Sequence, residues 1–184
     1  MRKKIRELTK ELKRANGAHI LYEFTDVEKY IDNIVTYVLG GIEQGDHVLI
    51  LENDKLYPMV HKKLTHILSQ EEMEKIHRVN NFDFYALQGD FNPNAKIKYL
   101  YKYLKPYIDE GISIRTWTHV EWGDQDKVIH DIKDYKEQIT TNSCEVGLTS
   151  IFAYNMERLT PLIKEYLIEC HDILMLDDSI VYIE

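Results

Sequence analysis

Residues 115–124, R-T-W-T-H-V-E-W-G-D, gather side chains suited to chemistry within one short segment. The segment holds both tryptophans of the chain, together with His119 and Glu121. Because side chains alternate along a strand, His119 and Glu121 leave the same face of the strand predicted here. An imidazole beside a carboxylate suits acid/base catalysis, or supplies two ligands to a metal ion that takes a third from elsewhere. A polar strand end is the more common reason for such a pair, and we expect no resident metal.

Motifs for other chemistry are missing or misplaced in the sequence. Neither G-x-S-x-G nor G-x-G-x-x-G occurs, and the G-x-x-x-x-G at residues 40–45 continues with Asp46 and His47 instead of Lys and Ser/Thr. Where a phosphate loop belongs, after the first core strand, the chain reads E-F-T-D-V-E-K-Y, whose acidic groups would repel a triphosphate. Cys144 and Cys170 are the only thiols and are typical of structural cysteines. We therefore expect no cofactor and no enzymatic activity.

The composition narrows the class of protein. A chain of 184 residues with a net charge of −8 and no long apolar run predicts one domain that contacts neither membranes nor nucleic acid. Two cysteines and the lack of a signal peptide favour the cytoplasm. Thirteen tyrosines against five phenylalanines indicate many aromatic faces with a hydroxyl, either at the edge of the core or lining a pocket.

These side chains must be positioned by alternating strands and helices. Short apolar or alternating runs predict strands at 18–24, 46–52, 81–87, 112–120 and 148–154, and a hairpin at 173–183. Helical periodicity predicts helices at 2–16, 27–42, 54–68, 71–76, 94–110, 126–141 and 161–170. We expect Gly40, Gly41 and Gly45 to end the second helix, Asp54 to cap the third, and Pro106 to kink or shorten its own helix.

The alternation predicts a three-layer α/β fold, with a largely parallel sheet, helices on both faces and an antiparallel hairpin at the C-terminus. We divide the chain into an N-terminal helix at 1–16 and one domain at 17–184. Ligands of such sheets bind at the carboxyl ends of the strands. There the sequence places aromatic, imidazole and carboxylate groups suited to a small, partly apolar ligand. The candidate ligand-binding residues are His19, Tyr22, Phe24, His119, Glu121, Trp122 and Tyr154.

The N-terminal helix is basic, with seven lysines and arginines among its first 14 residues. In so acidic a chain, a solvated helix or one that packs in a dimer is favoured over a nucleic-acid arm.

From residue 17 to 184 the chain resembles the MEDS family, the methanogen/methylotroph DcmR-type sensory domain. The resemblance rests on the order of G-A-H-I-L-Y-E-F, G-G-I-E-Q-G-D-H-V-L-I-L, G-D-F-N-P, D-E-G-I-S-I-R-T-W-T-H-V-E-W, D-Y-K-E-Q-I-T-T-N, I-F-A-Y-N and C-H-D-I-L. It implies a core like that of RecA/KaiC ATPases without the phosphate loop, and sensing of a small molecule. The positions that match family motif residues are His19, Tyr22, Trp122, Glu137, Tyr154 and His171.

Members of that family are often joined to a DNA-binding or histidine-kinase module, and beside the domain at 17–184 we expect only a short helix here. We therefore expect a non-enzymatic sensor of a small organic ligand that acts through a histidine kinase, a transcription regulator or self-association. Two alternatives stay open. One is a metal-assisted or acid/base enzyme that uses His119 and Glu121, and the other is a protein–protein adaptor with a vestigial nucleotide site.

Overall fold

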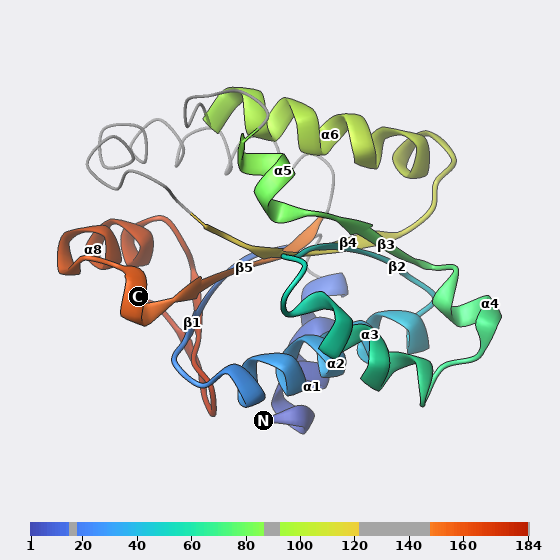
Figure 1. Cartoon of the computed structure of the whole chain (residues 1–184), viewed down its shortest axis with the longest axis horizontal. Coiled ribbons are helices and arrows are strands. Elements are labelled where there is room, and N and C mark those ends of the chain that lie inside the picture. Colours follow the sequence, from blue (N-terminus) through green and yellow to red (C-terminus); the bar gives the residue numbers. More distant parts are fainter. Residues whose placement is uncertain (15–17, 87–92, 122–147, 184) are drawn as a thin grey trace.

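The computed structural model describes residues 1–14, 18–86, 93–121 and 148–183 (Figure 1). Within these residues one sheet has the strand order β3-β2-β4-β5-β1-β6-β7. Its strands are β1 (Ala18–Phe24), β2 (His47–Leu51), β3 (Ile76–Val79), β4 (Ile114–His119), β5 (Thr149–Asn155), β6 (Ile173–Met175) and β7 (Ile180–Tyr182). All pairs are parallel except β6–β7, which is antiparallel. The predicted parallel sheet and C-terminal hairpin are confirmed.

Helices cover both faces of this sheet (Figure 1). One face carries α1 (Arg2–Arg14), α2 (Val27–Glu43) and α3 (Tyr57–Thr65), followed by the short α4 (Gln70–Met73). The other carries α5 (Asn81–Ala86), α6 (Pro93–Asp109) and α8 (Pro161–Glu169), which a 3₁₀ turn at Met156–Arg158 precedes. We call these the α2 face and the α6 face. The predicted three-layer architecture is thereby confirmed, and the helix predicted at 126–141 lies outside the described residues.

The core is divided between the two faces by the alternation of side chains along the strands. On β1, Ile20, Tyr22 and Phe24 join the cluster under α1 and α2. Leu21 joins the cluster with α8 on the α6 face. Neighbouring β1 side chains thus belong to different layers, and this decides which predicted site residues meet.

The helix predicted at 27–42 is α2 and ends at Glu43, so the expectation that Gly40 and Gly41 help to end it is wrong. Gly41 serves close packing instead, whereas Gly40 leaves room for a methyl group at an ordinary contact distance. A Cβ at Gly41 would lie 3.0 Å from Cδ of Arg115, and one at Gly40 would lie 3.5 Å from Oγ1 of Thr9 on α1. Gly45, with φ of +79°, is the glycine at which the chain turns out of the helix.

The basic helix α1 packs within the chain. Its apolar stripe of Ile5, Leu8 and Leu12 is buried in the same cluster as α2, and Arg6 pairs with Glu43 at 2.9 Å. We expected α1 to be solvated or to pack in a dimer. Its apolar stripe does neither, because α2 of the same chain covers it.

The strand predicted at 81–87 is wrong, because Asn81–Ala86 forms α5 and the edge strand is Ile76–Val79. The side chain of Asn80 accepts hydrogen bonds from the backbone N–H groups of Phe82 and Asp83, which starts a helix. This local cap overrides the apolar alternation of N-N-F-D-F-Y.

Two smaller expectations also change. The turn before α3 is closed by Asn53, whose Oδ1 accepts from the backbone N–H groups of Lys55 and Leu56, whereas Asp54 pairs with Arg78. Pro106 lies inside α6, which runs on to Asp109.

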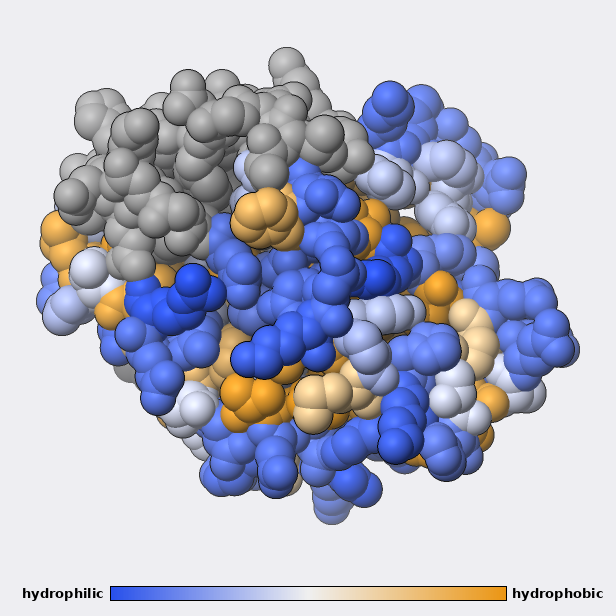
Figure 2. Space-filling view, viewed as in Figure 1, coloured by the Kyte–Doolittle hydropathy of each residue, from blue (hydrophilic) through white to orange (hydrophobic). Residues whose placement is uncertain are grey.

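No helix in the described ranges combines the length and apolar character that a membrane span requires. The face drawn in Figure 2 is mainly hydrophilic, with apolar residues in small separate groups.

Candidate functional site

Side chains from the carboxyl ends of β1, β2 and β4 come together on the α2 face, although β5 separates β4 from β1 in the sheet. Aromatic rings and a carboxylate gather here, and all are buried. They are Tyr22, Phe24, Tyr30, Glu52, Trp117 and His119. Phe24 contacts the rings of Tyr30 and His119, with centroids 4.3 and 5.4 Å apart.

Glu52 is the centre of a buried hydrogen-bond network. Its Oε1 lies 2.7 Å from Nδ1 of His119 and accepts from the backbone N–H of Asn53 at 2.8 Å. Its Oε2 accepts from the hydroxyl of Tyr30, whose oxygen accepts in turn from Nε1 of Trp117 at 2.9 Å. Burial, together with the Glu52 carboxylate, raises the pKa of Tyr30 well above its usual value, so the phenol stays protonated as a donor.

This network orients His119 toward the edge of the sheet. In the neutral tautomer that donates Nδ1–H to Glu52, Nε2 is the ring nitrogen without a proton. Nε2 lies 3.9 Å from Oε1 of Glu121, too far for a hydrogen bond. Oε1 of Glu121 does accept hydrogen bonds from Nδ2 of Asn53 at 3.4 Å and from Nη1 of Arg158 at 3.3 Å. We call His119, Glu121, Asn53 and Arg158 the rim.

The rim has the polar groups for acid/base chemistry or for holding a ligand. Glu121 keeps 27% of its side chain exposed, whereas that of His119 is 5% exposed, so a ligand reaches Glu121 first. Among the residues that the structure describes, no group of three or more His, Cys, Asp and Glu is arranged to hold a metal ion.

The turn between β1 and α2 is closed by carboxylates of the chain itself. Oδ2 of Asp177, from the β6–β7 turn, accepts from the backbone N–H groups of Thr25 and Asp26 at 3.0 and 3.1 Å, and Oδ1 accepts from the Tyr22 hydroxyl at 2.8 Å. Burial acts to raise the pKa of Asp177, but hydrogen bonds from Thr25, Tyr22 and Asp26 outweigh it and lower the pKa. Asp26 itself caps α2 by accepting from Glu28 and Lys29. The backbone donors that a phosphate loop would offer are therefore already bonded.

The structure brings together Tyr22, Phe24, His119 and Glu121 but places His19 and Tyr154 elsewhere. Both lie on the α6 face, and Trp122 lies outside the described residues. His19 is also near the amino end of β1, where it stacks on Phe152 at 5.6 Å. An odd spacing of three separates it from Tyr22, so the two side chains leave opposite faces.

His19 lies in a poorly solvated environment beside a second histidine. Neither of its ring nitrogens has a hydrogen-bond partner among the described residues, and burial, with His171 nearby, lowers its pKa to about 3. Burial also lowers the pKa of His171, whose Nδ1 lies 2.7 Å from the carbonyl oxygen of Leu167. Both imidazoles are therefore neutral at physiological pH.

Sequence reasoning missed several members of the site, among them Tyr30, Asn33, Asp177 and the rim residue Arg158. Tyr30 lies on the apolar stripe of α2 and is indistinguishable there from a core residue. Asn33 donates to the Tyr22 hydroxyl at 2.9 Å, and Asp177 belongs to a hairpin turn more than 150 residues away in sequence. Trp117 had a usable signal, because it shares strand parity with His119 and Glu121.

Comparisons with known proteins agree with this geometry. No curated protein matches the chain. A solved structure from Pyrococcus horikoshii OT3 is similar at 10% identity, with a TM-score of 0.54, over 90% of this chain and 85% of that one. The ATPase domain of G40P is similar at 9% identity, with a TM-score of 0.55, over 88% of this chain and 69% of that domain. At these identities the likeness concerns the fold, which is that of RecA-like ATPase domains, as predicted.

A family model places the chain more specifically. The model described as MEDS, the methanogen/methylotroph DcmR sensory domain, matches residues 18–172. This match includes β1 to β5 and the rim residues, and it ends before the closing hairpin. The chain belongs to the MEDS family of sensory domains.

Proposed function

We propose that the chain is a non-catalytic regulatory sensor that binds a small organic molecule at the rim and signals through a partner protein. Membership in a family of sensory domains supports a sensory or regulatory role. The closed turn between β1 and α2 supports a ligand other than a nucleotide, because Asp177 and Asp26 already bind the backbone donors there.

The observation that carries the proposal is the orientation of His119. Glu52, fully buried, holds its Nδ1 at 2.7 Å, which directs Nε2 to the edge where Glu121 is partly exposed. The rings of Phe24 and Tyr30 pack against the same imidazole. A preorganised acceptor beside a carboxylate and aromatic rings suits a small molecule with a polar group on an apolar body.

The same network offers a route by which binding changes the protein. From His119 it runs through Glu52 to the hydroxyl of Tyr30, which belongs to α2. A ligand that binds one arrangement of His119 more tightly than another would shift the population of α2 positions.

The test is a screen of metabolites by thermal shift, with tryptophan emission as the second readout. A ligand of the rim should stabilise the wild-type chain. Glu121→Gln, which keeps the shape of the side chain and leaves the Glu52 network intact, should weaken that ligand by about tenfold. Glu165→Gln, an exposed change of the same chemistry on α8, is the matched control. A ligand whose affinity is equal in all three proteins binds elsewhere and contradicts the proposal.

An acid/base enzyme is the second candidate, because a carboxylate-oriented imidazole is also what a general base requires. Incubation of any ligand found in the screen with stoichiometric protein separates the two. Recovery of the compound with unchanged mass and connectivity supports the sensor, and a His119-dependent product supports the enzyme.

A further inference from the structure

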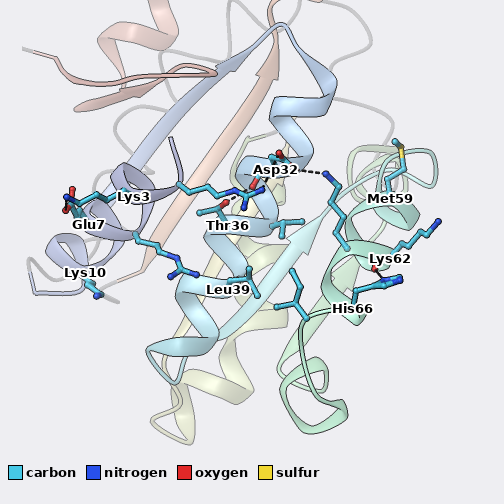
Figure 3. A pocket seen from close by; sticks show the side chains of 14 residues that line it. Lys3, Glu7, Lys10, Asp32, Thr36, Leu39, Met59, Lys62 and His66 are labelled. Carbon is cyan, nitrogen blue, oxygen red and sulfur yellow. Dashed lines mark hydrogen bonds and ion pairs between the residues drawn. The ribbon is translucent and has the colours of Figure 1, made fainter.

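A groove of about 1100 Å³ lies between α1 and α3, with the outer side of α2 as its floor (Figure 3). The α2 residues that line it follow the i, i+3, i+4, i+7 spacing of one helix face: Asp32, Val35, Thr36 and Leu39. Tyr30 and the rest of the sheet-facing side of α2 point away from it. The groove is therefore separate from the rim at His119.

Aliphatic side chains form part of the floor and part of one wall of the groove. Val35 and Leu39 lie on the floor, and Met59 and Ile67 on the α3 side are 48% and 60% exposed. Exposed aliphatic side chains gathered in a concave surface mark interaction sites more often than scattered ones do. Methionine adapts its shape to different apolar partners.

The edges of the groove are cationic. Six of its 14 lining residues are lysine or arginine and two are acidic, a net charge of +4 with His66 neutral, in a chain of net charge −8. Arg2 and Arg6 belong to the α1 edge, and Lys62 and Lys63 to the α3 edge. The apolar floor thus lies between two rows of positive charge.

Asp32 shows that the cationic edges of the groove can bind a carboxylate. Its carboxylate lies between the two edges, 2.5 Å from Nζ of Lys63 and 3.7 Å from Nη2 of Arg2 (Figure 3). These pairs are exposed and contribute little to stability. Arg6 pairs likewise with Glu43 at 2.9 Å and Lys3 with Glu7 at 3.7 Å, both exposed, so a carboxylate from outside can replace such contacts at little cost.

We propose that the groove binds an amphipathic helix of a partner protein, with an apolar stripe on the floor and acidic residues along both sides. Helices bind grooves in this way through anchors at i, i+3, i+4 and i+7. The lining residues include no phenylalanine, tyrosine or tryptophan, the rings on which single-stranded bases most often stack, which argues against single-stranded nucleic acid. A two-fold contact with a second copy would place two surfaces of net charge +4 against each other.

The proposal goes beyond the small-molecule site and stands independently of it. The probe is a helix-stabilised, fluorescein-labelled peptide of about 14 residues, ~21 Å of helix. That length matches the 13 residues of α1. It carries leucines at the anchor spacing and glutamates on both sides. One companion peptide has lysines in place of the glutamates, and a second has the leucines scrambled. Fluorescence anisotropy should detect binding of the first peptide alone, with an affinity that falls as salt is added.

Matched double variants locate the binding. Lys62→Glu with Lys63→Glu should weaken the acidic peptide by roughly tenfold or more, because like charges then face each other. Lys102→Glu with Lys105→Glu makes the same charge change on α6 and should leave the affinity within about twofold. Circular dichroism of both variants checks that each is folded.

Three outcomes overturn the proposal. The first is absence of binding by the acidic peptide, or equal binding by the scrambled one. The second is tighter binding of a DNA oligonucleotide that depends on Lys62 and Lys63, which makes the surface a nucleic-acid site. The third is self-association of the wild-type chain that the Lys62/Lys63 variant abolishes, which makes it an interface between copies.

Discussion

Nδ1 of His119 lies 2.7 Å from Oε1 of Glu52, and this contact joins the carboxyl ends of two adjacent parallel strands, β4 and β2. Because Glu52 is fully buried and also accepts from Tyr30 and Asn53, side chains of the protein itself fill the interior of the ligand site predicted at the carboxyl ends of the strands. Stability and ligand binding should therefore respond to different substitutions. Changes at Glu52 should affect stability, and changes at Glu121 should affect ligand binding.

Glu52→Ala should lower the free energy of unfolding by about 3 kcal/mol, because three buried donors lose their acceptor and a cavity remains. Glu121→Ala, at the partly exposed rim, should change it by less than about 1 kcal/mol. Urea denaturation measures both. Equal losses in the two variants would show that the network does not extend inward from the rim as described.

The carboxylate that closes the β1–α2 turn gives a second matched pair. Asp177→Ala removes the acceptor of Tyr22, Thr25 and Asp26 and should cost about 2 kcal/mol of unfolding free energy. Its neighbour Asp178 forms an exposed pair with Lys29, so Asp178→Ala should cost about 0.5 kcal/mol or less. If Asp177→Ala leaves the free energy of unfolding unchanged, the hydrogen bonds that Asp177 accepts do not stabilise the β1–α2 turn.

Much of the fold and half of the site were predictable, because both follow from local periodicity. Strand parity put His119 and Glu121 on one face, and the alternation of elements put them at the carboxyl edge. Strand ends alone do not say which face a side chain takes, so His19 and Tyr154 were grouped with residues across the sheet. The partners of Glu52 and Tyr22 come from distant segments, and long-range contacts of this kind leave no periodic signal.

The two adjacent glycines of α2 show the same limit and provide a third prediction. Their presence suggested a helix end. Gly41 is instead needed because the side chain of Arg115, which pairs with Asp46, lies directly against it. Gly41→Ala places a methyl group 3.0 Å from Arg115 and Val48, so it should destabilise the chain by about 1–2 kcal/mol.

Gly40→Ala is the control, since its added methyl group meets Thr9 at an ordinary 3.5 Å. Alanine favours a helix over glycine by up to about 1 kcal/mol, so this variant should be neutral or more stable. Thermal denaturation of the pair decides the matter. Two variants of equal stability would mean that Arg115 moves aside without cost.

Acid should destabilise the chain through His19. Its pKa is lowered from 6.5 to about 3 in the folded state, so below pH 6.5 the unfolded chain binds a proton that the folded chain does not. The stability that comes from keeping His19 neutral is complete above pH 6.5 and is lost as the pH falls. Between pH 7.5 and 5 the loss should be about 2 kcal/mol for this group.

His19→Leu removes the titrating group. Urea denaturation at pH 7.5 and pH 5 should therefore show that most of the difference in unfolding free energy between the two pH values is gone. A part should remain, because the pKa of His171 is lowered by burial as well. Phe152→Leu removes the ring on which His19 stacks but adds no titrating group, so it should lower stability alike at both pH values. If His19→Leu keeps the full wild-type difference, the acid sensitivity arises from other groups, and His19 is not the buried neutral histidine described here.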